Sequence, residues 1–272
     1  MKICGKSRRN QGGGGAIETD CLIRCVLFGL LLVGGCGRTQ MGEVEQEKTS
    51  GGTQRARRLD KTISNKVTCD YLLYLLVSYG RKEQTWPLIM FLHGAGERDD
   101  DLNKIKNIGP LAYAKRHKDF PFIALAPQCP LGTDWSTELL VKLLEDVTSR
   151  YSIDTDRVYL TGYSMGGWGT WNTAMRRPDL FAAIAPVCGR VVPMMCGNLW
   201  RTPVWVFHGR QDEHIPFECS VEMVGYLRGM DNKEVRFTAY DDLGHYCWDR
   251  VYDTDQLYEW FLSHSLKDPK KE

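Results

Sequence analysis

The feature that most constrains the fold of this chain is a strand-like run that ends in two spaced glycines around a serine. Residues 157–167 read RVYLTGYSMGG, an apolar stretch followed by Gly162, Ser164 and Gly166. The pattern predicts a strand that turns sharply into a helix, because the residues two before and two after the serine must be nearly free of side chains. Such a turn would expose Ser164 at the carboxyl edge of a sheet, beside the N–H groups of a helix start. The alternative is a glycine-rich helix start with a capping serine.

From about residue 62, short apolar runs alternate with longer amphipathic ones. This alternation is typical of an α/β fold, in which a mostly parallel central sheet has helices on its faces. The run PLIMFL at 87–92 is continuously apolar, as expected for a strand buried on both faces. We therefore expect one folded domain over 62–267. The predicted strands are 71–77, 87–92, 122–126, 157–160, 180–187, 203–207 and 235–239, and the predicted helices are 137–151, 165–176, 216–228 and 255–265.

A nucleophilic serine needs a base, and four histidines follow Ser164 in the chain: His208, His214, His245 and His264. We expect His245 to be the base, because it follows the last predicted strand and precedes the last predicted helix. His208 closes a strand and more simply packs or caps locally. His214 lies in the loop expected to hold the acid, and His264 stands near a helix end.

The base in turn needs a carboxylate that orients it. The candidates are Asp212, Glu213, Asp241 and Asp242. Asp212 follows a predicted strand by a short loop, a suitable distance for reaching the histidine. Asp241 and Asp242 lie so near His245 in sequence that they could simply cap the turn. We therefore expect Asp212 to be the acid and Glu213 to be an exposed charge.

A second glycine-rich turn follows the apolar strand at 87–92. Residues 90–98 read MFLHGAGER, and small residues there would let backbone N–H groups approach a substrate carbonyl. We expect the N–H groups of Ala95 and Met165 to form an oxyanion hole, with Gly94 as the alternative second donor. His93 is expected to be structural.

Three aromatic residues, Trp135, Tyr163 and Trp248, are candidates for lining a substrate pocket, with core packing as the alternative. No cysteine or histidine cluster has zinc-ligand spacing, so we expect no metal and no organic cofactor. An acidic turn at 99–101 could hold calcium, but a solvated turn is the simpler interpretation. The formal net charge of +1 gives no reason to expect a nucleic-acid partner. Ten cysteines permit disulfides, for which Cys188–Cys196 is one candidate pair.

The N-terminal region resembles an export signal. A basic lead is followed by the apolar run CVLFGLLLVGG at 25–35 and then by Cys36. This resembles a bacterial lipobox, in which the cysteine is lipidated, and we expect residues 1–36 to direct export and to attach the protein to a membrane. The alternatives are a cleavable signal peptide and a short anchor. Residues 37–61 are polar and are expected to form a flexible linker, and residues 268–272 a charged tail.

Several motifs together resemble those of the α/β-hydrolase superfamily. They are FLHGAGER at 91–98, APQCP at 126–130, TGYSMGGWGTW at 161–171, WVFHGRQDEHIP at 205–216 and GHYCW at 244–248. They look closest to the compact carboxylesterases of the polyhydroxybutyrate-depolymerase-like and feruloyl-esterase-like groups, which are related to prolyl-oligopeptidase catalytic domains. The resemblance implies an α/β-hydrolase fold and a Ser-Asp-His triad made of Ser164, Asp212 and His245. The short segment between the strands at 180–187 and 203–207 leaves no place for a large cap domain.

The substrate implied by this resemblance is a carboxylic ester, either a small molecule or one linked to a polymer. A serine peptidase of prolyl-oligopeptidase type is the alternative, and a non-catalytic binding protein is a third. The sequence does not indicate the acyl group or the oligomeric state.

Overall fold

The computed structural model describes three stretches of the chain, residues 53–62, 66–80 and 84–267. They lie in the compact unit Glu43–Glu272. The predicted leader at 1–36, which includes Cys36, and the predicted tail at 268–272 lie outside the described residues. Within the described stretches, no helix combines the length and the hydrophobicity needed to cross a bilayer.

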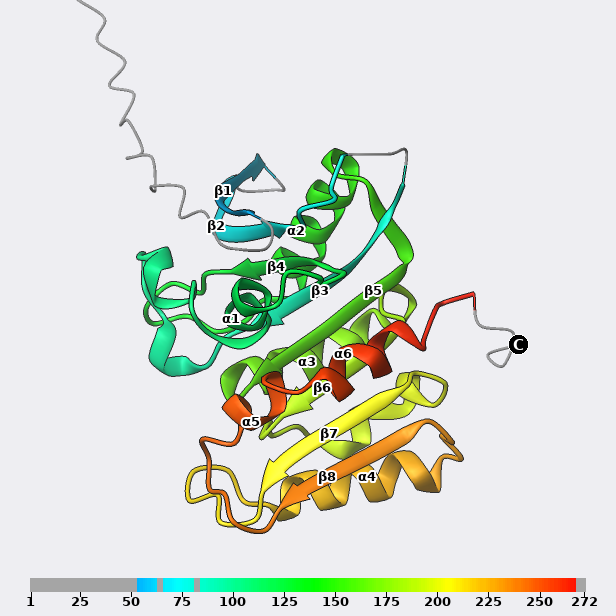
Figure 1. The fold of residues 1–272 in the computed structure, drawn as a ribbon. Coiled ribbons are helices and arrows are strands. Elements are labelled where there is room, and N and C mark those ends of the chain that lie inside the picture. Colours follow the sequence, from blue (N-terminus) through cyan, green and yellow to red (C-terminus); the bar gives the residue numbers. More distant parts are fainter. Residues whose placement is uncertain (1–52, 63–65, 81–83, 268–272) are drawn as a thin grey trace, which may run out of the picture. The chain divides into compact units, whose positions relative to one another are not determined.

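The described residues form an eight-stranded sheet in the order β1-β2-β4-β3-β5-β6-β7-β8 (Figure 1). The strands are β1 (Thr53–Thr62), β2 (Lys66–Leu75), β3 (Trp86–Leu92), β4 (Ile123–Pro127), β5 (Ile153–Tyr163), β6 (Ala183–Val187), β7 (Val204–Gly209) and β8 (Val235–Tyr240). β2 is antiparallel to both of its neighbours, β1 and β4. All other neighbouring strands are parallel, so the sheet is mostly parallel, as predicted.

The most apolar strands lie in the middle of the sheet. Every residue of β4 and β6 is buried, and Trp86 alone is partly exposed in β3. The apolar run at 87–92 is therefore a strand covered on both faces, as its composition indicated. β5 begins at Ile153, earlier than the predicted 157, because residues 154–157 are polar and at least partly exposed and so lack the apolar signal.

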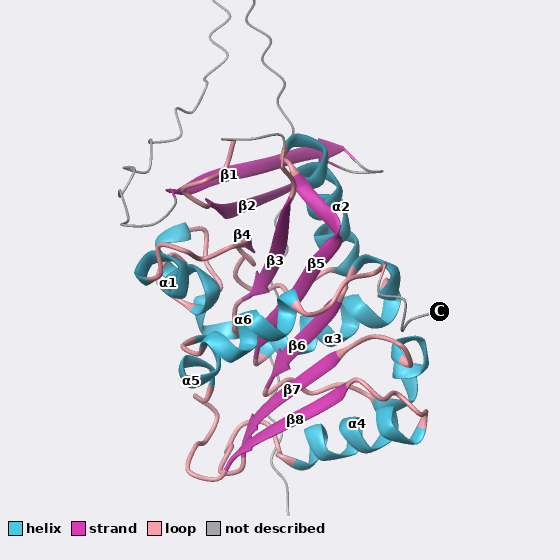
Figure 2. Ribbon diagram, turned by 45° about the vertical axis from the view of Figure 1, so that its right-hand side comes forward, coloured by secondary structure: helices cyan, strands magenta, loops and turns pink. Residues whose placement is uncertain are grey.

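Helices cover both faces of the sheet. They are α1 (Gly109–Arg116), α2 (Thr137–Arg150), α3 (Met165–Arg176), α4 (Glu218–Gly229), α5 (Trp248–Tyr252) and α6 (Asp255–Leu262). In Figures 1 and 2, α1, α5 and α6 lie on one face, and α2, α3 and α4 lie on the other. The predicted bounds of α3 are confirmed, whereas α1 and α5 were not predicted, because both are too short to show a helical period.

The linker predicted for 37–61 is wrong over residues 53–61, which belong to β1. β1 pairs with β2 along its full length, from Thr53 opposite Leu75 to Thr62 opposite Lys66. The Arg58 guanidinium also forms a bidentate ion pair with Asp70, with bonds of 2.7 and 3.0 Å. β1 is an edge strand of the described sheet, where charged side chains are common, so its polar composition concealed it.

The connection between β6 and β7 is short. Residues 188–203 are all described and contain one 3-10 helix, η4 (Pro193–Leu199). The described chain therefore carries no large cap domain over the carboxyl ends of these strands, as predicted.

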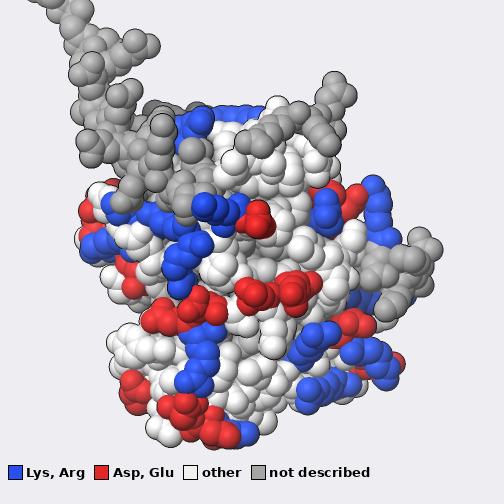
Figure 3. All heavy atoms as spheres, viewed as in Figure 1, with Lys and Arg blue, Asp and Glu red and all other residues white. Residues whose placement is uncertain are grey.

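Basic and acidic side chains lie interspersed on the face of the molecule shown in Figure 3. Some of them pair between elements, as Arg116 of α1 does with Asp253 after α5, at 2.9 Å. The mixture agrees with the formal net charge of +1.

Candidate active site

Ser164 occupies the turn between β5 and α3, with φ 54° and ψ −117°. Its backbone is in a region that residues with side chains rarely adopt, which is typical of a strained catalytic turn. Gly162 and Gly166 make this turn possible. A Cβ on Gly162 would lie 2.6 Å from Leu92 O, and one on Gly166 would lie 1.9 Å from the same atom. The glycine spacing is therefore a steric requirement, as the sequence indicated.

The structure brings the predicted nucleophile, base and acid together. Ser164 follows β5, Asp212 follows β7 and His245 follows β8, and the carboxyl ends of these parallel strands share one edge of the sheet. His245 Nε2 lies 2.9 Å from Ser164 Oγ, and His245 Nδ1 lies 2.7 Å from Asp212 Oδ2. A continuous hydrogen-bonded chain thus joins the hydroxyl to the carboxylate, which is the geometry that proton transfer from a serine requires.

Asp212 is fully buried and held by several donors. Its Oδ1 accepts the backbone N–H groups of His214 at 2.8 Å and Ile215 at 2.7 Å, while Oδ2 accepts from His245. Burial alone would raise the pKa of this carboxyl. The hydrogen bonds from His245, Ile215 and His214 outweigh burial and hold the pKa of Asp212 below its ordinary value. The acid is therefore ionised at neutral pH.

The other candidate acids form different contacts. Glu213 accepts from the backbone N–H of His245 at 3.4 Å, so it supports the histidine loop and leaves the imidazole to Asp212. Asp241 pairs with Arg210 at 2.6 Å, and Asp242 forms two bonds with Arg250 at 2.9 and 2.8 Å. Of the four candidate carboxylates, Asp212 is therefore the one whose side chain hydrogen-bonds to the His245 ring.

His208 lies closer to the acid than the sequence suggested. Its Nε2 is 3.1 Å from Asp212 Oδ2, the same oxygen that accepts from His245. One signal for this contact is visible in the sequence, since His208 lies near the end of a strand, four residues before Asp212. The expectation that it packs or caps locally did not include the carboxylate.

The predicted oxyanion donors lie on adjacent elements. Met165 opens α3 directly after Ser164, and Ala95 opens the 3-10 helix η1 (Ala95–Glu97) after β3. β3 and β5 are neighbours, with Leu92 paired to Gly162, so both turns begin at the same edge of the sheet. His93 is buried, and both of its ring nitrogens contact the backbone: Nε2 accepts from Cys129 N at 3.0 Å, and Nδ1 lies 2.7 Å from Gly94 O. These contacts agree with the structural role expected for it.

A cavity of about 460 Å³ opens beside Ser164 and Met165. The other residues that line it are Asp134, Trp168, Arg190, Val191, Val192 and Ile215. None of these six was predicted. Two signals could have found them: Trp168 lies one helical turn after Ser164, and residues 190–192 follow the carboxyl end of β6, where parallel sheets place ligand-binding loops.

Two of the three aromatic residues predicted to line a pocket are core residues. Trp135 is 3% exposed, packs against Gly169, and donates from Nε1 to His93 O at 3.1 Å. Tyr163 is 1% exposed and stacks on Trp248 at 4.1 Å between ring centroids. These two side chains are buried in the core and do not line the cavity beside Ser164. Their prediction as pocket residues is therefore wrong.

Trp248 is partly exposed and lies beside the base. Its ring centroid is 5.5 Å from that of His245 and 4.9 Å from that of Tyr246, which is 67% exposed. Neither Tyr246 nor Trp248 is among the residues that line the cavity beside Ser164. The role of Trp248 as a substrate contact stays a prediction.

The cysteines of the described chain are free thiols, and Cys188 and Cys196 are not bridged. Cys188 instead lies near Cys247 and donates from Sγ to His245 O at 3.6 Å. Cys188, Asp212 and His245 form the one cluster of metal-ligating side chains in the described stretches. Since Asp212 and His245 already hydrogen-bond to each other, we interpret the cluster as part of the hydrogen-bond network.

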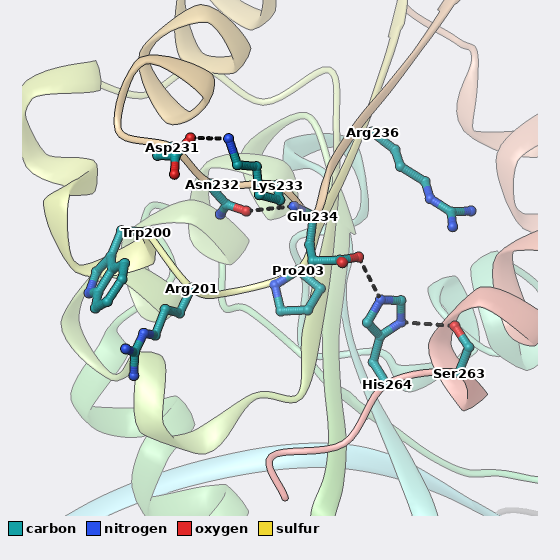
Figure 4. Close-up of a pocket in the computed structure, with 10 residues that line it drawn as sticks. All are labelled: Trp200, Arg201, Pro203, Asp231, Asn232, Lys233, Glu234, Arg236, Ser263 and His264. Carbon is teal, nitrogen blue, oxygen red and sulfur yellow. Dashed lines mark hydrogen bonds and ion pairs between the residues drawn. The ribbon is translucent and has the colours of Figure 1, made fainter. Parts of the chain in front are cut away.

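A second cavity, of about 350 Å³, lies at the opposite ends of the strands from Ser164. Pro203 and Glu234, which line it, directly precede β7 and β8, so it sits at the amino ends of these strands. Figure 4 shows the Glu234 carboxylate facing the ring of His264, at 3.7 Å, and Lys233 paired with Asp231. No residue predicted for the site lies here.

The sequence is similar to those of known esterases. Residues 128–254 match a family model described as phospholipase/carboxylesterase. The chain is 26% identical over 149 residues to the bifunctional acetylxylan esterase/xylanase XynS20E of Neocallimastix patriciarum, which is 52% of this chain and 21% of that protein. It is 25% identical over 180 residues to the probable feruloyl esterase C of Aspergillus terreus, which is 64% of this chain and 66% of that protein. The chain thus spans only part of the length of these relatives.

The fold is also similar to that of a solved esterase. The crystal structure of a thermostable esterase superposes with a TM-score of 0.71 and 30% sequence identity, over 78% of this chain and 63% of that one. Its likeness extends over most of the described sheet and helices, and the family match spans both the Ser164 turn and the loops of Asp212 and His245. The chain therefore has an α/β-hydrolase fold, and residues 128–254 are similar to the phospholipase/carboxylesterase family.

Proposed function

We propose that this protein is a serine-dependent carboxylic ester hydrolase in which Ser164, His245 and Asp212 form the catalytic triad. The observation that carries the proposal is the hydrogen-bonded chain from Ser164 Oγ through His245 to Asp212, with bonds of 2.9 and 2.7 Å. Ser164 lines a cavity that is large enough for an acyl group. Nucleophile, base and orienting acid are thus present together.

In the first half of the reaction, Ser164 Oγ attacks the ester carbonyl carbon while its proton passes to His245 Nε2. Ionised Asp212 stabilises the imidazolium that forms. The tetrahedral intermediate collapses when His245 returns the proton to the leaving alcohol, and an acyl-enzyme remains on Ser164. Water then attacks the acyl-enzyme with His245 again as base, which releases the carboxylic acid.

The negative oxygen of the tetrahedral intermediate needs donors that are in place before the reaction. We assign this role to the backbone N–H groups of Met165 and Ala95, with Gly94 as the alternative to Ala95. Each such donor typically contributes about 3 kcal/mol to transition-state stabilisation. Both residues lie in turns that follow adjacent strands, β5 and β3.

The cavity and its open edge favour an ester with a bulky or polymeric component. Its lining is mainly apolar and includes Trp168, Val191 and Val192, which suits a planar or aliphatic acyl group. Residues 188–203, which are all described, form no large cap domain, so we expect that an ester displayed on a polymer can reach Ser164. The names of two relatives, acetylxylan esterase and feruloyl esterase, agree with this substrate class.

A panel of aryl esters, from acetyl to hydroxycinnamoyl, tests the function and measures the acyl preference. We expect turnover of one or more esters by the wild type, and none above background by Ser164→Ala. Aminoacyl-anilides in the same panel test the peptidase alternative, and we expect much slower turnover of these amides. An active amidase that does not hydrolyse the esters would contradict the proposal.

We also propose that residues 1–36 direct export and that Cys36 is the lipidated residue. The support for this is the apolar run at 25–35 that ends next to Cys36. Expression of the full chain in a bacterium with labelled palmitate should label the wild type and leave Cys36→Ser unlabelled. Equal labelling of both would contradict lipidation at this position.

A further inference from the structure

His208 lies beside the acid, in a place that the ester-hydrolysis mechanism does not use. It is the penultimate residue of β7, and its side chain is 0% exposed. Nε2 lies 3.1 Å from Asp212 Oδ2 and 3.0 Å from Ile215 O, while Nδ1 lies 2.7 Å from Ser220 Oγ. Both ring nitrogens are therefore engaged, one of them with the acid.

These contacts determine which nitrogen of His208 carries the proton. Nε2 faces a carboxylate oxygen and a carbonyl oxygen, which can only accept, so Nε2 must be the donor. Nδ1 faces the hydroxyl of Ser220, which can donate to it. Burial lowers the pKa of His208, against the opposing effects of Ile215 and Asp212, so the ring stays neutral with its proton on Nε2.

Asp212 Oδ2 consequently accepts from two histidines that behave differently. His245 gains and loses a proton at Nε2 in each half of the proposed reaction, and its ring must respond to the substrate. His208 forms no hydrogen bond to Ser164 and does not line the cavity, although its Nε2 also donates to the backbone carbonyl of Ile215, which does line it. Two backbone N–H groups donate to Asp212 Oδ1, and His208 donates to Oδ2, so both carboxylate oxygens have a donor besides His245.

We propose that His208 is a positioning residue for the acid: it donates from Nε2 to Asp212 Oδ2 and holds the carboxylate in the orientation that His245 needs. The proposal rests on the triad proposed above. Because His208 bonds to Asp212 and its own side chain does not line the cavity, it acts on the catalytic rate through Asp212. Substrate binding does not depend on it.

The first test replaces the imidazole and follows kcat and KM separately on an aryl ester. His208→Leu should lower kcat about 10- to 100-fold, the size expected for one lost hydrogen bond to a charged group, with KM within about twofold. His208→Gln keeps an N–H donor that can reach the same oxygen and should recover part of the loss. His264→Leu is the matched control, because it removes another buried histidine at the opposite edge of the sheet (Figure 4) and should leave kcat unchanged.

A double-mutant cycle with Asp212→Asn separates positioning from general packing. If His208 acts through the acid, His208→Leu should change kcat by no more than about twofold in the Asp212→Asn background. The same fold loss in both backgrounds would overturn the proposal, as would an unchanged kcat for His208→Leu alone.

Two further variants keep the test decisive if His208→Leu does not fold. Ser220→Ala removes the partner of Nδ1 and leaves the donor in place, and His208→Gln changes the ring alone. Each variant should lower kcat a few-fold in the wild-type background and should not lower it further in the Asp212→Asn background. The same fold loss of kcat in both backgrounds would overturn the proposal. The wild type in the same assay provides the separate test of the function, since a wild type without ester turnover refutes the hydrolase proposal itself.

Discussion

The two ends of β7 and β8 carry similar side chains in different arrangements. At the carboxyl ends, the side chains of His208, Asp212 and His245 are buried, and both histidines hydrogen-bond to Asp212. At the amino ends, a cavity of about 350 Å³ is also lined by charged residues and a histidine. There, however, Asp231 and Lys233 are 78% and 77% exposed and pair with each other at the surface.

The comparison shows that a cavity with charged walls does not by itself make a reactive site. Buried polar groups must satisfy each other, because water cannot, and this fixes them in one geometry. Exposed ion pairs are screened by solvent and hold their side chains only loosely. We therefore expect substitutions at the carboxyl ends to change catalysis strongly and those at the amino ends to change it little.

The largest effect is expected from Ser164→Ala. Loss of the nucleophile should lower kcat for the best ester by about 10⁴-fold or more, as in other enzymes of this mechanism. The free energy of unfolding should stay nearly the same, because alanine occupies the same turn. Ester turnover by the purified variant above a hundredth of the wild-type rate would mean that another residue is the nucleophile.

Asp212→Asn is expected to lower kcat by about 10³- to 10⁴-fold. The amide can present its own N–H to His245 and so favour the wrong tautomer, while the fold is kept. Steady-state kinetics at neutral pH, with a circular-dichroism check of the fold, measures this. A loss of less than tenfold would show that the buried carboxylate is not needed to orient the base.

Gly166→Ala tests the steric basis of the Ser164 turn. Its new Cβ would lie 1.9 Å from Leu92 O, so we expect the free energy of unfolding to fall by about 3 kcal/mol or more. Gly225→Ala in α4 is the matched control. Its Cβ meets no atom within 4 Å, and alanine should stabilise the helix by about 0.5–1 kcal/mol. Similar denaturation midpoints for the two variants would contradict this account of the turn.

The pH dependence of stability tests the buried acid. Because the pKa of Asp212 is held below its ordinary value of 3.8, its ionised form stabilises the folded state above that pH. This contribution should be lost as the pH falls below 3.8, through the lowered folded-state pKa. Asp212→Asn should therefore lose less free energy of unfolding than the wild type between about pH 6 and pH 3. An equal loss in both proteins would argue against the lowered pKa.

The smallest effect is expected at the amino ends of the strands. Glu234→Gln weakens the 3.7 Å contact with His264. Since Glu234 is half exposed, the free energy of unfolding should fall by less than about 1 kcal/mol, with kcat within about twofold. A clear loss of ester turnover by Glu234→Gln, measured in the same assay as Asp212→Asn, would show that the amino and carboxyl ends of these strands are coupled.

The sequence was most informative where the local pattern and the tertiary structure coincide. The bounds of α3 and the roles of Gly162 and Gly166 followed from the sharp turn alone, and the apolar run at 87–92 identified a central strand. Chain order then pointed to Asp212 and His245. These features depend on residues that are near in sequence or that follow predicted strands.

Features that depend on distant partners were missed. β1 is specified by its pairing with β2, not by apolar alternation, so its polar residues suggested a linker. Trp135 and Tyr163 are aromatic, and aromatic residues occur both in pockets and in cores. Only the packing of Trp135 against Gly169 and of Tyr163 against Trp248 shows that they are core residues. The contact of His208 with the acid is an exception: the two residues are only four apart in sequence, and the contact depends on how the loop after β7 folds.

The most direct test of the central claim is covalent labelling with a fluorophosphonate, read by intact mass and peptide mapping. The hydrogen bond from Ser164 to His245 predicts one adduct per chain on Ser164, no adduct with Ser164→Ala, and much slower labelling with His245→Ala. A folded wild-type protein that stays unlabelled, or that is labelled on another residue, would contradict the assignment of Ser164 as the activated nucleophile.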